Sequence, residues 1–148
     1  MTRVLVLQGP NLDLLGSREP EIYGHETLDQ IHAGMTQRAD VLSLGVGFFQ
    51  SNHEGALIDR LHQRDFDVAI VNAAGLTHTS VSLRDALLAI ERPFIEVHLS
   101  DPSTREPFRR VNFLRDIALE SIVGQGPLGY TLALESIARR VAAGELPG

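Results

Sequence analysis

The chain has 148 residues, a formal net charge of −6, 43% hydrophobic and 22% charged residues, and no cysteine. This length and composition predict a single domain over residues 1–148 and exclude disulfides, thiolate metal sites and a cysteine nucleophile. The acidic charge argues against a nucleic-acid partner, and no apolar run approaches the roughly 18–20 residues that span a bilayer, so we expect no membrane span.

The chain opens with a predicted strand over residues 4–7, which ends at a glycine–proline turn signal. No signal-peptide cleavage region precedes it, so we expect a cytoplasmic protein. Residues 9–24 are polar, bounded by glycine at both ends and without a clear period. A connection of this length is usually a functional lid or a disordered segment, and Asn11, Arg18 and Tyr23 favour a lid.

Two helices and one strand follow. Residues 27–38 have a helical period and a capping box at their start. Residues 41–49 are rich in Val, Leu and Phe but contain two glycines, which predicts a bent edge strand. Ser51-Asn52 is the predicted cap of a helix over residues 53–63.

The central stretch predicts a strand, a polar turn and a helix. Four apolar residues at 68–71 indicate a strand that is buried on both faces. Small residues and hydroxyls then lead into a helical period over residues 81–90. Asn72 and His78 lie in that turn, where open α/β sheets place their chemistry, and are candidate ligand-binding residues.

The last third predicts two strands and a helix. A strand over residues 93–99 carries Glu96 and His98, which point to the same side of an extended chain. A polar loop, a short strand over residues 119–124 and a helix after Pro127 follow. We expect this helix to bury four residues: Leu128, Leu132, Ile137 and Val141.

Strands that alternate with helices predict an α/β fold, here a flavodoxin-like three-layer sandwich. Its parallel five-stranded sheet should have the order 2-1-3-4-5, with helices on both faces. In that order the first, third and fourth strands share one crevice at their carboxyl ends. Five residues should converge there: Asn11, Asn72, His78, His98 and Ser100.

Glu96 and His98 are a candidate acid–base pair. A histidine at a strand end is often only a hydrogen-bonded structural residue. A buried carboxylate on the same side would fix its tautomer and favour the imidazolium, which is a usable general acid near neutral pH.

Tyr23 is a candidate base, although a tyrosine beside a glycine is usually just a loop residue. Its unperturbed pKa of about 10 leaves only about 0.1% phenolate at pH 7, and ionising it requires lowering the pKa by about three units. A nearby opposite charge shifts a pKa by about 1–3 units, so one or two close arginines are needed. The chain offers four: Arg18, Arg105, Arg109 and Arg110.

Other common catalytic and cofactor-binding constellations are not supported. There is no G-x-S-x-G elbow, and the loop after the first strand has no G-x-G-x-x-G or Walker pattern and is not the Ser/Thr-rich phosphate loop of a flavin site. The remaining histidines lack the spacing of a zinc site.

Several motifs resemble the type II 3-dehydroquinate dehydratases, or type II dehydroquinases, over essentially the whole chain. GPNLDLLGSREPEIYG (9–24) resembles their N-terminal segment and lid, and NAAGLTHTSVSLRDAL (72–87) their central signature. IEVHLS (95–100) and REPFRR (105–110) resemble the acid-bearing strand and the arginine segment. Several long motifs in the right order are far more specific than one short pattern.

The resemblance implies a lyase that dehydrates 3-dehydroquinate to 3-dehydroshikimate through an enolate, without metal or cofactor. The pathway would be the shikimate route to aromatic amino acids or quinate catabolism. Tyr23 would take the proton next to the ketone, and Arg18 would keep Tyr23 ionised. Asn11 would help to hold the enolate oxygen through a water. His98, oriented by Glu96, would protonate the leaving hydroxyl.

The resemblance also assigns binding roles to the other rim residues. Asn72 and the backbone amides of Leu99 and Ser100 would hold the substrate carboxylate. His78 and Arg109 would hold ring hydroxyls.

The family forms dodecamers, built as tetramers of trimers, and Asp85 would reach a neighbouring subunit's site. The chain departs from the family pattern at Gln8, at Asp101 and at residues 111–113. Two alternatives therefore stay open: a divergent member that acts on a related cyclic polyol acid, and a flavodoxin-like binding module without activity.

Overall fold

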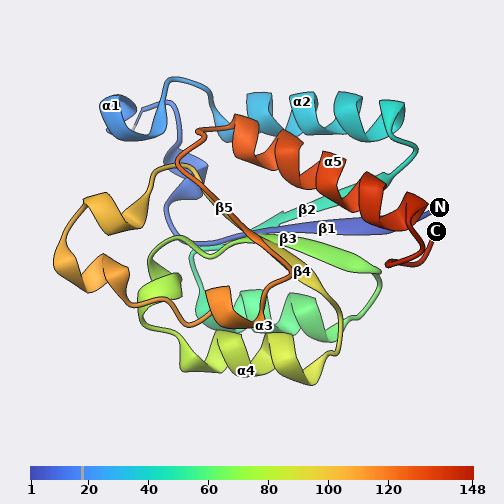
Figure 1. Ribbon diagram of the computed structural model, residues 1–148. Coiled ribbons are helices and arrows are strands. Elements are labelled where there is room, and N and C mark those ends of the chain that lie inside the picture. Colours follow the sequence, from blue (N-terminus) through green and yellow to red (C-terminus); the bar gives the residue numbers. More distant parts are fainter. Residues whose placement is uncertain (18) are drawn as a thin grey trace.

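The structure is a computed structural model that describes residues 1–17 and 19–148, with the backbone but not the side chain of Tyr23. Within these residues, five strands form one sheet in the order β2-β1-β3-β4-β5 (Figure 1), which confirms the predicted topology. Neighbouring strands pair in parallel. The strands are β1 (Arg3–Gln8), β2 (Gly45–Gln50), β3 (Val68–Asn72), β4 (Phe94–His98) and β5 (Ser121–Val123).

Helices cover both faces of the sheet, with α2 and α5 on one face and α3 and α4 on the other (Figure 1). The α-helices are α1 (Pro20–Tyr23), α2 (Leu28–Val41), α3 (Glu54–His62), α4 (Val81–Ala89) and α5 (Leu128–Ala142). Short 3-10 helices lie in the connections: η1 (Leu12–Leu14), η2 (Ala74–His78), η3 (Pro102–Thr104), η4 (Pro107–Arg110) and η5 (Arg115–Ile117). In the described part of the chain, no helix combines the length and the apolar character needed to cross a membrane.

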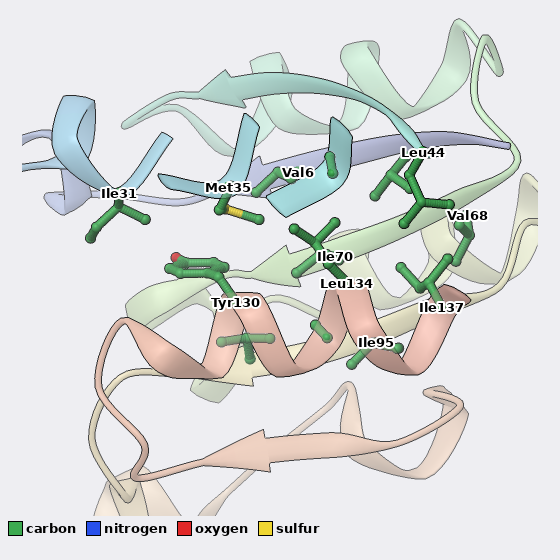
Figure 2. Close-up of a cluster of buried hydrophobic side chains, with 14 of the residues drawn as sticks. Val6, Ile31, Met35, Leu44, Val68, Ile70, Ile95, Tyr130, Leu134 and Ile137 are labelled. Atoms are coloured by element: carbon green, nitrogen blue, oxygen red, sulfur yellow. The ribbon is translucent and has the colours of Figure 1, made fainter. Parts of the chain in front are cut away.

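The strand side chains alternate between two apolar layers. Val4 and Val6 of β1 pack in the cluster with α2 and α5, whereas Leu5 and Leu7 pack in the cluster with α3 and α4. Figure 2 shows the first cluster, in which the ring of Tyr130 from α5 lies among aliphatic side chains. Full burial of one aliphatic side chain stabilises a fold by about 1.5–3 kcal/mol. The central strands β1, β3 and β4 are buried on both faces, as their apolar runs predict, whereas the edge strands β2 and β5 are only partly buried.

One predicted helix cap is confirmed and another is wrong. The side chain of Thr27 accepts from the Gln30 amide and the Gln30 side chain accepts from the Thr27 amide, which is the predicted capping box of α2. The predicted Ser51-Asn52 cap of α3 is wrong, because the N-cap position is His53, which makes no side-chain cap bond.

Two strand boundaries and one burial prediction are also wrong. β2 begins at Gly45 rather than at residue 41, because α2 continues to Val41 and Ser43 turns the chain with a φ of 58°. β5 begins at Ser121 rather than at residue 119. Leu128 is 54% exposed because it starts α5 at the edge of the layer, while the other three residues predicted to be buried with it are buried or partly buried.

The segment predicted as a lid contains two short helices. Asn11 precedes η1 and Glu19 precedes α1, and both have a positive φ, 71° and 41° respectively. Such values are uncommon for residues other than glycine, so the chain reverses tightly before each short helix.

Candidate active site

A cavity of about 180 Å³ lies at the carboxyl ends of β1, β3 and β4. Its walls come from the chain after β1, from η2, from the end of β4, and from η3 and η4. This is the crevice where open α/β sheets bind ligands. Seven of the predicted site residues line it: Asn11, Asn72, His78, His98, Leu99, Ser100 and Arg109.

Four predicted site residues are placed differently. Glu96 does not line the cavity in the described structure but contacts His98, which does. Asp85 is exposed on α4 and is not among the described residues that line the cavity. Arg18 lies outside the described residues. The side chain of Tyr23 lies outside them too, although its backbone ends α1.

The chain that enters the cavity after β1 passes very close to the end of β3. The Gly9 amide donates to the Asn72 carbonyl at 2.8 Å, and a Cβ on Gly9 would lie 2.4 Å from the Ala73 carbonyl oxygen. Only glycine allows this approach. Two residues further on, the Asn11 amide donates to Asn52 Oδ1 at 2.9 Å. These contacts fix the backbone from which Asn11 borders the cavity.

Glu96 and His98 form the predicted pair at the end of β4. His98 Nε2–H donates to Glu96 Oε2 at 2.8 Å, and the carboxylate is fully buried. Asn112 Nδ2 also donates to Oε2, at 2.8 Å, and Ser121 Oγ donates to Oε1 at 2.6 Å. Burial alone would raise the pKa of Glu96, but the bonds from His98, Ser121 and Asn112 hold it below its usual value. Glu96 therefore stays ionised and fixes the imidazole by its Nε2 proton.

His78 lines the same cavity as His98. Its Nδ1–H donates to the Val111 carbonyl at 2.6 Å. Burial lowers the pKa of His78, and the nearby charges of His98 and Arg109 act in the same direction, while the Val111 bond and Glu96 oppose them. A neutral imidazole that donates from Nδ1 has Nε2 as an acceptor, which suits a ligand hydroxyl.

Asn72 is held by a buried chain of neutral groups that sequence reasoning missed. Asn72 Nδ2 and Gln8 Nε2 each donate to the Tyr130 hydroxyl at 3.0 Å. Gln8 Oε1 in turn accepts from His32 Nε2 at 2.6 Å, and Asn72 Oδ1 accepts from the Ala74 amide at 3.1 Å. The amide of Asn72 therefore has one fixed orientation at the cavity wall.

Two arginines form a basic wall despite the net charge of −6. Arg105 and Arg109 both line the cavity. Arg109 pairs with Glu106, three residues before it. Arg105 Nη2 lies 3.9 Å from Glu19 Oε2, which connects the cavity wall to the segment that holds α1. Local positive charge of this kind is what an anionic ligand requires.

Gln8 and Asp101, where the chain departs from the family pattern, are not among the described residues that line the cavity. Gln8 is fully buried in the chain of neutral groups. Asp101 Oδ1 accepts from the amide and the hydroxyl of Ser103, and these bonds lower the pKa of Asp101. Asp101 is not among the described cavity-lining residues, so the divergent-substrate alternative gains no support from it. The described residues also contain no cluster of three or more His, Cys, Asp or Glu side chains that could hold a metal ion.

Fold and cavity together define a class: a flavodoxin-like α/β protein with a histidine–carboxylate pair in a small polar site. The model of one protein family, Dehydroquinase class II, matches residues 2–138. The chain belongs to this family of enzymes.

Similar proteins agree with this assignment over nearly their whole length. The 3-dehydroquinate dehydratase of Methylococcus capsulatus is 56% identical over 139 residues, covering 92% of this chain and 94% of that protein. That of Francisella tularensis subsp. novicida is 53% identical over 131 residues, covering 88% and 90%. The solved type II dehydroquinase of Propionibacterium acnes superimposes with a TM-score of 0.89 at 36% identity, covering 94% of this chain and 97% of that one.

Proposed function

We propose that the chain dehydrates 3-dehydroquinate to 3-dehydroshikimate by a stepwise elimination through an enolate. The observation that carries the proposal is His98 in the cavity wall with the buried Glu96 bonded to it, in a chain of the class II dehydroquinase family. Such an elimination needs a base, a stabilised enolate and an acid for the leaving group.

The acid is His98. Glu96 accepts a hydrogen bond from Nε2–H, so Nδ1 is the nitrogen that remains to give a proton to the substrate. In the second step the enolate oxygen re-forms the ketone, and the carbon–carbon electron pair of the enolate forms the new ring double bond. The carbon–oxygen bond to the hydroxyl breaks, and the imidazolium gives that oxygen a proton, which releases water. The buried carboxylate stabilises the imidazolium before this step.

The base is Tyr23 as its phenolate, kept ionised by Arg18. It takes the proton from the carbon next to the ketone, and the electron pair of the broken bond forms the enolate, whose oxygen Asn11 holds through a water molecule. Both Arg18 and the Tyr23 side chain are assigned from the sequence. The contact between Glu19 and Arg105 supports the assignment, because it joins this segment to the cavity wall.

The remaining lining residues bind the substrate. Asn72 and the backbone amides of Leu99 and Ser100 hold the carboxylate, as backbone N–H groups commonly bind anions. Neutral His78 accepts from a ring hydroxyl through Nε2, and Arg109 donates to another. The fixed amide of Asn72 supports this assignment, since it presents one orientation to every substrate molecule.

The assembly we propose is a dodecamer, built as a tetramer of trimers, in which Asp85 reaches a neighbouring subunit's site. Asp85 is exposed on α4, and Val81 and Leu88 on the same helix are exposed apolar residues. A stable, fully active monomer in sedimentation would contradict this arrangement. We further propose that the enzyme is cytoplasmic and serves the shikimate pathway or quinate catabolism.

The decisive experiment is an activity assay. Purified protein is mixed with 3-dehydroquinate, and the ultraviolet band of the conjugated product is followed. We expect turnover without added metal or cofactor, and near-total loss of kcat in Tyr23→Phe with substrate still bound. Absence of turnover in the unmodified protein would overturn the proposal. An unchanged kcat in Tyr23→Phe would refute the role of the base and revive the reading as a binding module.

A further inference from the structure

Asn112 makes an unusual set of contacts behind the acid–base pair. It lies between η4 and η5, and its Nδ2 donates to the buried Glu96 Oε2 at 2.8 Å. Its Oδ1 accepts from the amides of Leu114 at 2.8 Å and Arg115 at 2.9 Å. One side chain therefore closes the turn into η5 and touches the carboxylate that holds His98.

The orientation of this amide is determined by chemistry. Backbone N–H groups only donate, so the atom of Asn112 that faces Leu114 and Arg115 must be the oxygen. The NH₂ group must then face Glu96. Flipping the amide would oppose donors to donors at the turn and an oxygen to a carboxylate oxygen at Glu96.

Oε2 of Glu96 consequently has two donors, Asn112 and His98, whereas Oε1 receives Ser121. A carboxylate oxygen that shares its charge with a second donor attracts the imidazolium proton less strongly. The second donor also prevents the carboxylate from rotating away from His98. Residue 112 thus influences both the position of the imidazole and its proton affinity.

We propose that Asn112 is a positioning residue that fixes the Glu96 carboxylate and sets the protonation equilibrium of His98. The proposal deepens the function proposed above and rests on it for the catalytic consequence. Its neighbour Val111 has a parallel role, since its carbonyl accepts from His78 Nδ1. Two successive residues therefore support the two histidines of the cavity.

Other charged groups near the pair come from three elements. His78 extends from η2, Asp101 precedes η3, and Arg109 lies on η4 with Arg105 just before that helix. Asp101 carries a negative charge there, and the two arginines carry positive charges. A substitution at residue 112 removes none of these charges, so we assign a change in His98 titration to the contact with Glu96.

The test is Asn112→Asp, which keeps the shape and the oxygen that closes the turn but replaces the donor with a second acceptor. We expect the His98 titration, followed by NMR of the imidazole, to move to higher pH by about one unit. The alkaline limb of the kcat profile should move in the same direction, because it reports loss of the imidazolium. We expect kcat to fall about 10-fold to 100-fold, with KM changed less than kcat.

Asn112→Ala is the second variant, should Asn112→Asp fold poorly. It removes the donor without adding charge, so the expected shift has the same sign and a smaller size. Asp116→Asn is the matched control on the same segment, because Asp116 pairs with Arg84 on the outer surface. Exposed His62 is the internal reference. Asp116→Asn should leave the His98 titration unchanged, and the His62 signals should behave alike in all the variants.

The two proposals can fail separately. A His98 titration within error of the unmodified protein in both Asn112 variants would overturn the positioning role, whatever the activity. A shifted titration in a protein that never converts 3-dehydroquinate would support the positioning of His98 and refute the proposed function.

Discussion

Two buried polar networks meet at the cavity, and they are built from different chemistry. The acid network joins Glu96 to three donors, His98, Asn112 and Ser121, at the end of β4. The amide network joins Asn72, Tyr130, Gln8 and His32 behind the ends of β1 and β3. The acid network has a charge at its centre, whereas the amide network is neutral throughout.

The ionisation of each network follows from its contacts. Burial would raise the pKa of Glu96, but its donors lower the pKa below the usual value. In the amide network burial prevails: it raises the pKa of Tyr130 against the bonds from Gln8 and Asn72, and lowers that of His32 against the charge of Asp29. A charged network suits proton transfer, and a neutral one suits the fixed orientation of a binding group. The first should therefore control kcat and the second KM.

Among substitutions within the two networks, the largest expected effect comes from removing the acid. In His98→Ala we expect kcat to fall about 10²-fold to 10⁴-fold, the usual contribution of general acid–base catalysis, while KM changes little because the amide network is intact. Steady-state kinetics checks this, with exposed His62→Ala on α3 as the control that should retain full activity. A loss of less than 10-fold would mean that another group protonates the leaving hydroxyl.

The next effect comes from Tyr130→Phe, which removes the acceptor shared by Gln8 and Asn72. Each buried donor left unpaired costs about 1–3 kcal/mol, so the free energy of unfolding should fall. Asn72 also loses its anchor, and we expect KM to rise more than kcat falls. Urea unfolding and kinetics measure the two effects.

Ser136→Ala is the matched control for Tyr130→Phe, since it deletes a hydroxyl on the same helix that contacts Glu120 and Arg140 rather than the cavity. It should lower stability without changing KM. Equal KM values in the Tyr130 variant and the unmodified protein would separate the amide network from substrate binding.

Sequence patterns predicted the part of this architecture that depends on local periodicity. The apolar run at residues 68–71, alternating with helical periods, was sufficient for the strand order, because few right-handed topologies remain. The same order brings the ends of β1, β3 and β4 together, so the convergence of Asn11, Asn72 and His98 on one cavity was predictable. The helical period could not fix where α2 stops, since Val41 continues it into the predicted strand.

The supporting residues were not predictable in the same way. Tyr130 contacts Gln8 across 122 positions, and its place on an apolar helix face suggests only a core residue. Asn112 reaches Glu96 from an irregular segment with no period to orient it. For Tyr130 the sequence offers one indication of a buried hydrogen bond, a hydroxyl on an otherwise apolar helix face. For Asn112 it offers none. Contacts of this kind depend on tertiary geometry, which a single sequence does not encode locally.

A smaller effect is expected from Gln8→Asn, which shortens the side chain by one methylene. The shorter amide loses reach to Tyr130 or to His32, a loss of about 1 kcal/mol for one hydrogen bond and about 0.8 kcal/mol for the buried methylene. The bond from Asn72 to Tyr130 remains, so KM should rise less than in Tyr130→Phe. A larger rise than in Tyr130→Phe would show that Gln8 acts on the cavity by another route.

The smallest expected effect is on the pH dependence of stability, in which the two networks should contribute in different pH ranges. His32 has a folded-state pKa below its unfolded value of about 6.5, so folding favours its neutral form. The contribution of neutral His32 to the free energy of unfolding should be full above about pH 6.5 and should decline as the pH falls from there through the folded pKa. Ionised Glu96 contributes to the free energy of unfolding above its unfolded pKa of 4.5. This contribution is lost as the pH falls through the lower pKa of Glu96 in the folded state.

Urea unfolding measured in pH steps from 7.5 to 3.5 distinguishes the two windows. One proton changes the free energy of unfolding by at most about 1.4 kcal/mol per pH unit. His32→Gln should reduce the slope just below pH 6.5, leaving the part due to His78, whose pKa is also lowered by burial. Glu96→Gln should reduce the slope below about pH 4.5, where His32→Gln leaves it unchanged. Identical slopes in both variants would mean that the networks do not titrate independently, and the division between a proton-transfer region and an orienting region would fail.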